Sequence, residues 1–409
     1  MGRLTVVDEI FLRTHRGMGT PIALQGLWRT TGRVDIELLR EVHGALRVGP
    51  LGRRVVRPRV PGARPYWRPN RSAHPLRVAE RPIPADGLLE WADAQGFDLD
   101  PEFGPGWRLA TARLDDGGSV VSLTCSHALA DGRGLVIAVD NALAGTAVTE
   151  HAAVQSDWAD ARRQWSVVLN GTARALRRGI PSRPEAPAPR VAGTEAATHS
   201  AVLQIPAADW ELTAAARGGT ANSLFVYVVA KMLWDSGFPE PTISASLPVD
   251  TRDEPHVDND MAMTEVTVTR ADTPATLREK CRAAYEHRMS SPGALPEELL
   301  QVLPDRLSYT LSRGAGERDI LCSNIGPLPN SLSRLGPHRC TGVAARAIHP
   351  GLSPTHLPRT HLSAYLSRIS HTYTLALTTL DPTRIHSPKA LKDLATTTLT
   401  TLELPTTPW

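Results

Sequence analysis

Cysteines, lysines and long apolar runs are all scarce in this chain of 409 residues. The four cysteines form no CxxC pair and no His/Cys cluster at metal-ligand spacing, so the sequence predicts neither a disulfide framework nor a metal site. No segment approaches the roughly 18 to 20 uninterrupted apolar residues of a membrane span. The residues before Asp8 also lack the basic head and apolar run of a secretory signal. We therefore expect a soluble cytoplasmic protein with reduced thiols.

A strong excess of one charge is missing as well, because the formal net charge is only +3. Four lysines stand among the 45 basic residues, so arginine dominates, a bias that fits a GC-rich coding sequence. The arginines are scattered rather than gathered on one helix or stripe, which argues against a nucleic-acid partner. A hydrophobic content of 41% suffices for packed interiors and argues against a disordered chain.

The chain is longer than a single hydrophobic core usually accommodates, so we predict two domains. The clearest linker begins at residue 178, where closely spaced prolines block regular pairing and favour extended backbone. We divide the chain into an N-terminal subdomain of residues 1–177, a Pro/Arg-rich linker of 178–197 and a C-terminal subdomain of 198–409. Strand and helix patterns mix in both halves, which predicts an α/β (α+β) class.

Local patterns place the expected elements. Asp35 is positioned to cap a helix, and the turn Asp115-Asp116-Gly117-Gly118 is typical of an antiparallel hairpin, because Gly and Asp tolerate positive φ. We predict strands over 20–28, 107–114, 119–125, 198–205, 242–247, 265–269, 320–323, 361–367 and 373–379, and helices over 35–46, 223–234, 276–289, 296–311 and 388–402.

The segment Ser126-His127-Ala128-Leu129-Ala130-Asp131-Gly132 carries the most chemical information. It joins the second hairpin strand to a helix-like apolar run. An imidazole has an unperturbed pKa of about 6.5, so His127 can take a proton at neutral pH and return it. Asp131 either orients the ring or holds the loop through a buried ion pair with an arginine, and Gly132 permits the turn. The sequence predicts a general base with its support.

Other interpretations of this segment exist. An HxxxDG match occurs by chance in many proteins, and a lone histidine is usually an ordinary core or surface residue. Ser126 invites comparison with a nucleophile beside His127, but adjacent strand residues point to opposite faces and no G-x-S-x-G elbow surrounds it. The junction of a hairpin strand with a helix positions catalytic residues well, and this favours the catalytic interpretation.

This motif and the order of elements resemble the HxxxDG acyltransferase superfamily. It contains chloramphenicol acetyltransferase (CAT), nonribosomal peptide condensation domains, plant HxxxD acyltransferases, polyketide-associated acyltransferases and wax ester synthase/diacylglycerol acyltransferases. The match in His127, Asp131 and Gly132 is complete, whereas Ser126 stands where many members carry a dispensable first histidine. In appearance the chain is most similar to the wax ester synthase-type and polyketide-associated members.

Further segments resemble family elements in the expected order, including 4–12 and 220–224. Residues 49–56 resemble the HPxLRxR element, whose arginine usually pairs with the motif aspartate. The resemblance therefore implies Arg53, or failing that Arg54, as the partner of Asp131. Residues 247–252 resemble the PVxxR element, which places Arg252 along the channel or leaves it in a surface contact or salt bridge. Residues 323–327 resemble the SNxxGP element.

The resemblance implies two CAT-like subdomains that form a V-shaped pseudo-dimer, with His127 midway along a central channel that Ser126 also lines. An acyl-CoA or a phosphopantetheinylated carrier protein would bring the acyl group as co-substrate, with no bound cofactor. His127 would deprotonate the hydroxyl or amine of a small-molecule acceptor. The Gly132 N–H and the side chains of Ser323 and Asn324 are candidate donors to the oxyanion, and losing one such donor typically costs about 3 kcal/mol.

The expected setting is specialised-metabolite or lipid biosynthesis, with the protein acting as a monomer. Neither the acyl chain nor the choice between alcohol and amine follows from the sequence. The alternative function is a non-catalytic condensation-like module that recruits a carrier protein or partner enzyme. A hydrolase or another transferase that shares the motif by accident is a third reading.

Overall fold

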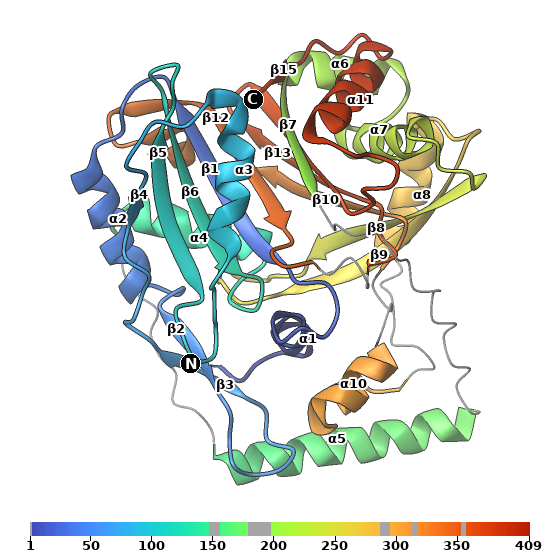
Figure 1. Ribbon diagram of the computed structural model, residues 1–409. Helices are drawn as coiled ribbons and strands as arrows, with labels where there is room; N and C mark the ends of the chain where they lie inside the picture. Colours follow the sequence, from blue (N-terminus) through green and yellow to red (C-terminus); the bar gives the residue numbers. More distant parts are fainter. Residues whose placement is uncertain (1, 147–155, 179–197, 287–294, 313–316, 353–356) are drawn as a thin grey trace.

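Two large sheets lie side by side in the computed structural model, which describes residues 2–146, 156–178, 198–286, 295–312, 317–352 and 357–409 (Figure 1). The six-stranded sheet has the order β11-β12-β1-β6-β5-β4 and the seven-stranded sheet the order β15-β7-β14-β13-β10-β8-β9. A small third sheet pairs β2 with β3. The strands are β1 (Ala23–Thr30), β2 (Arg53–Val56), β3 (Tyr66–Pro69), β4 (Arg77–Val78), β5 (Trp107–Arg113), β6 (Ser119–Ser126), β7 (His199–Pro206), β8 (Thr242–Asp250), β9 (Met261–Thr269), β10 (Ile320–Pro327), β11 (Arg334–Leu335), β12 (His338–Ile348), β13 (Leu362–Ile369), β14 (Thr372–Thr379) and β15 (Thr407–Pro408).

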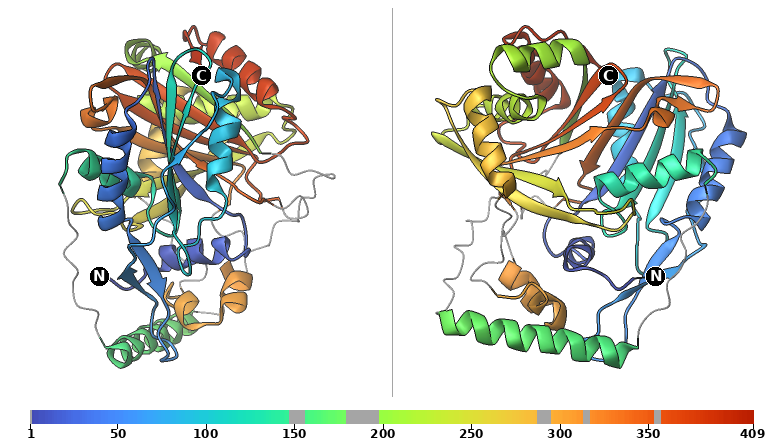
Figure 2. Two further views of the ribbon diagram at one scale, coloured as in Figure 1. Left: turned by 60° about the vertical axis from the view of Figure 1, so that its left-hand side comes forward. Right: turned by 180° about the vertical axis from the view of Figure 1, so that it is seen from behind.

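Helices cover both sheets, so the predicted mixed α/β class is confirmed (Figure 2). Asp35 caps its helix as expected, because its carboxylate accepts from the Glu37 N–H. The predicted β5–β6 hairpin forms with an antiparallel register. The helices are α1 (Val6–His15), α2 (Ile36–Val48), α3 (Leu88–Asp93), α4 (Gly132–Leu143), α5 (Asp157–Arg178), α6 (Ala207–Ala216), α7 (Ala221–Asp235), α8 (Pro274–Glu286), α9 (Leu299–Val302), α10 (Asp305–Ser312) and α11 (Pro388–Thr400), with short 3-10 turns at Ala85–Gly87, Ala94–Gly96 and Asn330–Ser333.

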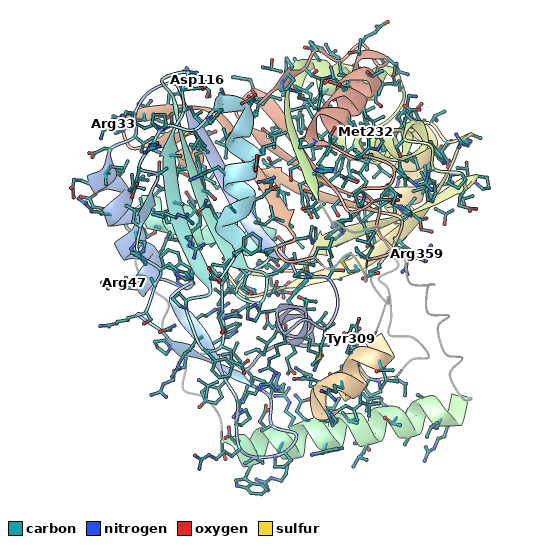
Figure 3. The ribbon with its side chains drawn as sticks, viewed as in Figure 1. Arg33, Arg47, Asp116, Met232, Tyr309 and Arg359 are labelled. Atoms are coloured by element: carbon teal, nitrogen blue, oxygen red, sulfur yellow. The ribbon has the colours of Figure 1, made fainter. Side chains whose placement is uncertain are left out.

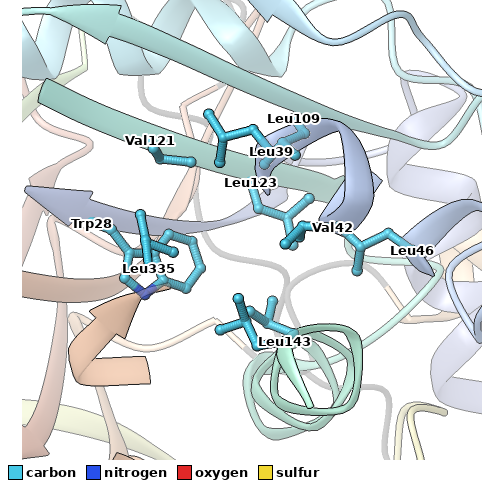
Figure 4. Close-up of a pocket in the computed structure, with 10 residues that line it drawn as sticks. Trp28, Leu39, Val42, Leu46, Leu109, Val121, Leu123, Leu143 and Leu335 are labelled. Atoms are coloured by element: carbon cyan, nitrogen blue, oxygen red, sulfur yellow. The ribbon is translucent and has the colours of Figure 1, made fainter. Parts of the chain in front are cut away.

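One face of the six-stranded sheet packs against α2 and α4. Trp28 on β1 and Val121 on β6 are paired across the strands, and both face a void shared with Leu39 of α2 and Val139 of α4 (Figure 4). The void measures about 10 Å³, which is about the space of one water molecule. All of its lining residues are apolar. This face is therefore a close-packed core rather than a ligand site.

The seven-stranded sheet carries its own core. Helix α7 lies against β8, β10 and β13, and its buried side is apolar apart from Ser223. Met232 on this side has no exposed surface (Figure 3). A capping box starts α7, since Thr220 and Ser223 exchange side-chain and backbone hydrogen bonds. Each sheet thus has a hydrophobic centre of its own, as expected for two subdomains.

The division at residues 178–197 does not separate the two sheets. Strands β11 and β12 come from the part assigned to the C-terminal subdomain, yet they extend the six-stranded sheet, with β12 paired to β1. The Thr378 hydroxyl also donates to the Ala347 carbonyl, which ties β14 to β12. A boundary drawn by composition misses this exchange, because strand pairing is a long-range contact. Most of the linker, residues 179–197, lies outside the described residues.

The single helix predicted over 296–311 is wrong, because α9 and α10 are separate. Pro304 lies between them and Leu303 has an extended backbone, as expected for a residue before proline. The break directs α10 toward the N-terminal helix α1 (Figure 3). A Cβ atom on Gly19, in the loop after α1, would lie 3.4 Å from the Tyr309 ring. Within the described part of the chain, no helix is long and apolar enough to cross a membrane.

Candidate active site

His127 follows the last residue of β6, in the middle of the six-stranded sheet. Its N–H donates to the Ile22 carbonyl at 3.4 Å, which continues the pairing of β6 with β1. Alternation along β1 puts Ile22 on the same face as Trp28, so His127 projects from the face that α2 and α4 cover. The strand therefore places the imidazole at one end of the core between this sheet and its helices.

The His127 imidazole is held by stacking rather than by a carboxylate. Its ring lies parallel to the Phe11 ring of α1, with centroids 3.5 Å apart and an interplanar angle of 14°. Only 9% of the residue is exposed, and the Nδ1 atom has no hydrogen-bond partner among the described residues. Burial lowers the pKa of His127 from 6.5 to about 4, and the charge of Asp131 opposes this only in part. The ring is consequently neutral at pH 7.

Asp131 is committed to other partners. Its carboxylate caps α4 by accepting from the Gly134 N–H at 2.8 Å, and it accepts from the Asp260 N–H at 3.1 Å. Both of its oxygens lie 2.7 Å from the Arg252 guanidinium. The Asp131 and Arg252 side chains are only 6% and 4% exposed, so this is a buried ion pair between the two halves.

The expected pairing of Asp131 with Arg53 or Arg54 is therefore wrong. Arg53 instead forms an ion pair with Asp258, donates to the Leu129 carbonyl at 2.6 Å and lies over the Trp67 ring. Arg54, the next residue on β2, pairs across the small sheet with Arg68 and points to the other face of its strand. Arg53 thus fixes the middle of the motif loop, whereas an arginine after β8 reaches the aspartate.

Asn259 is a residue that sequence reasoning missed. It is 2% exposed, and its amide donates to the His127 carbonyl at 2.9 Å and to the Asp8 carboxylate at 2.8 Å. Burial raises the pKa of Asp8 to about 6. Asn259 thereby joins α1, which carries the stacked Phe11, to the motif loop. No local pattern around 259 signals this, because every partner lies on a distant segment.

Space rather than a turn requires the glycine at 134, whereas a Cβ on Gly132 would meet only the flexible end of the Ile325 side chain. A Cβ atom on Gly132 would lie 2.9 Å from the Ile325 side chain, and one on Gly134 would lie 2.4 Å from the Val257 carbonyl. Both residues belong to α4, and neither has a positive φ. The expectation that Gly132 serves a sharp turn is corrected accordingly, since the C-terminal half packs against the bare backbone at the start of α4.

None of the remaining predicted site residues forms a hydrogen bond with the His127 ring. Ser126 lies on the opposite face of the strand, where its hydroxyl accepts from the Ala128 N–H at 3.3 Å. Asn324 is exposed, and its amide donates to Asn222 at 2.9 Å. Ser323 is half-buried on β10, paired with Tyr365. An oxyanion role for Ser323 or Asn324 remains a prediction, and Arg252 is an ion-pair partner.

Asn324 faces a hollow of about 700 Å³ on the C-terminal half. The hollow has a lining of apolar and polar side chains that includes two arginines and two carboxylates, and His127 is not part of it. Asp250, which lines it, also accepts from the Arg252 guanidinium at 2.8 Å, so the hollow adjoins the ion pair that holds Asp131. Its lining residues are Thr220, Asn222, Pro248, Val249, Asp250, Arg278, Cys281, Arg282, Tyr285, Glu286 and Asn324.

A second histidine–aspartate pair lies far from the motif, in the seven-stranded sheet. His361 Nδ1 lies 2.6 Å from the Asp381 carboxylate, and the Phe238 ring meets the imidazole edge to face. Among the described residues, no group of three or more His, Cys, Asp or Glu is arranged to hold a metal ion.

Comparison with known proteins finds similarity at the level of structure. No family model matches the sequence and no curated protein does. The first condensation domain of the CDA synthetase superposes with a TM-score of 0.62 at 14% identity, over 98% of this chain and 94% of that one. The wax ester synthase/diacylglycerol acyltransferase from Marinobacter aquaeolei VT8 has a TM-score of 0.59 at 15% identity, covering 98% and 99%.

A mutant starter condensation domain of rhizomide synthetase, in complex with C8-CoA and Leu-SNAC, has a TM-score of 0.59 at 12% identity, covering 98% and 93%. The chain therefore has the condensation-type acyltransferase fold of two CAT-like subdomains over nearly its whole length, which confirms the predicted fold.

Proposed function

We propose that the protein transfers an acyl group from a phosphopantetheine thioester, either acyl-CoA or acyl carrier protein, to the hydroxyl or amine of a small molecule. One observation carries the proposal: a buried imidazole, stacked on the Phe11 ring, stands at the end of β6, while the motif aspartate is bound by Arg252. A neutral imidazole can accept a proton at pH 7. Stacking on the Phe11 ring restricts the rotation of the imidazole out of its plane.

The proposed reaction is a direct transfer without an acyl-enzyme. His127 takes the proton of the acceptor O–H or N–H as the oxygen or nitrogen attacks the thioester carbonyl carbon. The carbonyl becomes a tetrahedral oxyanion, and its charge offsets the cost of a buried imidazolium. The C–S bond then breaks, the thiolate receives the proton from His127, and the ester or amide leaves with a free thiol. The start of α4 offers the Gly132 N–H as an oxyanion donor.

In this proposal the phosphopantetheine arm of the acyl donor binds in the hollow on the C-terminal half. Arg278 and Arg282 on α8 are exposed along it and would meet phosphate groups, which arginine binds well. A structural neighbour in complex with C8-CoA makes a medium-chain acyl-CoA the natural first substrate to test. The biosynthetic setting, in specialised metabolites or lipids, stays part of this proposal.

The test is a panel of acyl-CoA donors against simple alcohols and amines, with ester or amide formation followed by mass spectrometry. His127→Ala should lower kcat by about 10²–10⁴-fold, the usual contribution of a positioned general base. His361→Ala is the matched control, because it removes a buried imidazole that belongs to the other subdomain, and it should leave kcat near the wild-type value. Equal turnover by wild type and His127→Ala would overturn the general-base role.

A panel without product from the wild type, together with binding of a phosphopantetheinylated carrier protein, would favour the recruiting module instead.

A further inference from the structure

A second buried histidine lies beside His127, at the end of β12. Register places it: Ala23 of β1 pairs with Ser126 on one side and with Ile348 on the other. The next position of each neighbouring strand is a histidine, so His127 and His349 flank Ile22 from opposite sides. Residues paired across strands project from the same face, which here is the face covered by α4. The two imidazoles therefore border the same end of the core.

The hydrogen bonding of His349 fixes which nitrogen carries its proton. Its Nδ1 lies 2.9 Å from the Pro21 carbonyl oxygen, which only accepts, so Nδ1 is the donor. Burial lowers the pKa of His349 to about 4, so the ring is neutral at pH 7 and Nε2 bears a lone pair. His349 is 8% exposed, and Nε2 has no partner among the described residues.

A buried acceptor without a donor costs on the order of 1–3 kcal/mol. A residue that served only to donate to the Pro21 carbonyl would need no second nitrogen. The unsatisfied Nε2, one strand away from the base across β1, therefore points to a donor that arrives with the substrate.

We propose that His349 contacts the substrate, with Nε2 accepting a hydrogen bond from an O–H or N–H of the acceptor and thereby orienting it toward His127. This inference rests on the proposed acyl transfer and deepens it. His349 takes no proton in the reaction, since Nδ1 stays bonded to Pro21 and the transferred proton goes to His127. The acceptor class it implies carries a second donor hydrogen besides the one removed, such as a primary amine, a diol or an amino alcohol.

Two amide substitutions separate the two nitrogens of His349. The His349→Asn substitution can place an amide N–H near the Nδ1 position and keep the bond to Pro21, but it leaves no atom at Nε2. The His349→Gln substitution reaches the Nε2 position with its carbonyl oxygen and restores an acceptor there. The kinetic probes are octanoyl-CoA with octylamine, and with 1-octanol, whose single O–H lacks the second hydrogen.

His349→Asn should lower kcat/KM for octylamine about tenfold and leave KM for octanoyl-CoA unchanged, as expected when one positioning hydrogen bond is lost. His349→Gln should recover most of this loss, and the 1-octanol reaction should be nearly insensitive to both substitutions. Thermal unfolding of the three proteins is measured in parallel. Equal losses for both acceptors, or a raised KM for the donor, would assign His349 to packing and overturn the proposal.

A second measurement does not depend on turnover. In protein labelled with ¹⁵N-histidine, the unprotonated Nε2 of His349 is identified by its absence from His349→Asn. Adding octylamine in the presence of CoA should move this resonance toward the position of a hydrogen-bonded nitrogen. No movement would mean that water or nothing occupies the site, and it would overturn the inference. Loss of turnover in His127→Ala alone would leave the proposed function standing, so the two failures are distinguishable.

Discussion

The molecule has two histidine–aspartate pairs, one close in the sequence but not bonded to each other, and one distant in the sequence but in direct contact. His127 and Asp131 stand in one motif, yet the Asp131 carboxylate binds Arg252 and two backbone N–H groups. His361 and Asp381 are 20 residues apart, and their side chains meet at 2.6 Å. A carboxylate beside an imidazole stabilises its charged form. In the motif the Asp131 carboxylate is bound by other partners, and burial lowers the pKa of His127 and leaves its ring neutral at pH 7.

The largest expected effect is a difference in stability between variants of the two aspartates. Asp131→Ala should lower the free energy of unfolding by about 3–5 kcal/mol, because it strands the buried Arg252 guanidinium. Asp381→Ala should cost less, since a guanidinium always carries its charge and an imidazole can exist as a neutral ring without a counter-charge. Urea denaturation of both variants measures the difference. A smaller loss for Asp131→Ala than for Asp381→Ala would contradict this account of the motif.

A substitution of both partners sharpens the first comparison. Arg252→Met combined with Asp131→Ala should be less destabilising than the sum of the two single substitutions, because no unpaired charge stays buried. Additive losses would show that the two side chains act independently.

The pH dependence of stability is the next effect. The pKa of His127 falls from 6.5 in the unfolded chain to about 4 in the folded protein, so the unfolded state binds more protons between these values. Stability from this residue is therefore lost as pH falls from about 6.5 to 4, and the loss reaches about 2 kcal/mol at pH 5. Asp8, with its pKa raised to about 6, works in the opposite direction.

Because opposing groups mask one another, the measured quantity is the difference between wild type and His127→Ala. The unfolding free energy of the variant should fall less than that of wild type between pH 7 and pH 5. Parallel curves for the two proteins would mean that His127 is charged to the same extent when folded and unfolded.

The smallest effect concerns the glycines that let the C-terminal half approach α4. Gly134→Ala should destabilise by about 1 kcal/mol, because the strain of a Cβ at 2.4 Å from the Val257 carbonyl outweighs the gain in helix propensity. Gly44 is the matched control, since it lies within α2 with nothing within 4 Å, and Gly44→Ala should stabilise by about 0.5–1 kcal/mol. Thermal denaturation should move the two melting temperatures in opposite directions.

Local sequence predicted much of the architecture. Alternation and turn residues gave the β5–β6 hairpin, and Asp35 marked the start of α2. The apolar run before His127 correctly indicated a strand that ends at the base. Elements failed where local cues conflicted, as in the predicted helix over 296–311, where the apolar spacing was read past Pro304. Strand β12 went unpredicted, although residues 343–348 before His349 are apolar apart from Arg346 and follow a pattern like that before His127.

The sequence by itself determined that His127 stands at the end of a buried strand and that Asp131 begins the next helix, because both follow from neighbouring residues. Only the tertiary structure decided that Arg252 rather than Arg53 holds Asp131, and that Gly134 makes room for Val257. It also brought His349 alongside His127 through the shared strand β1. These contacts join residues more than 100 positions apart, and pairing, burial and close approach between distant segments arise only when the whole chain has folded.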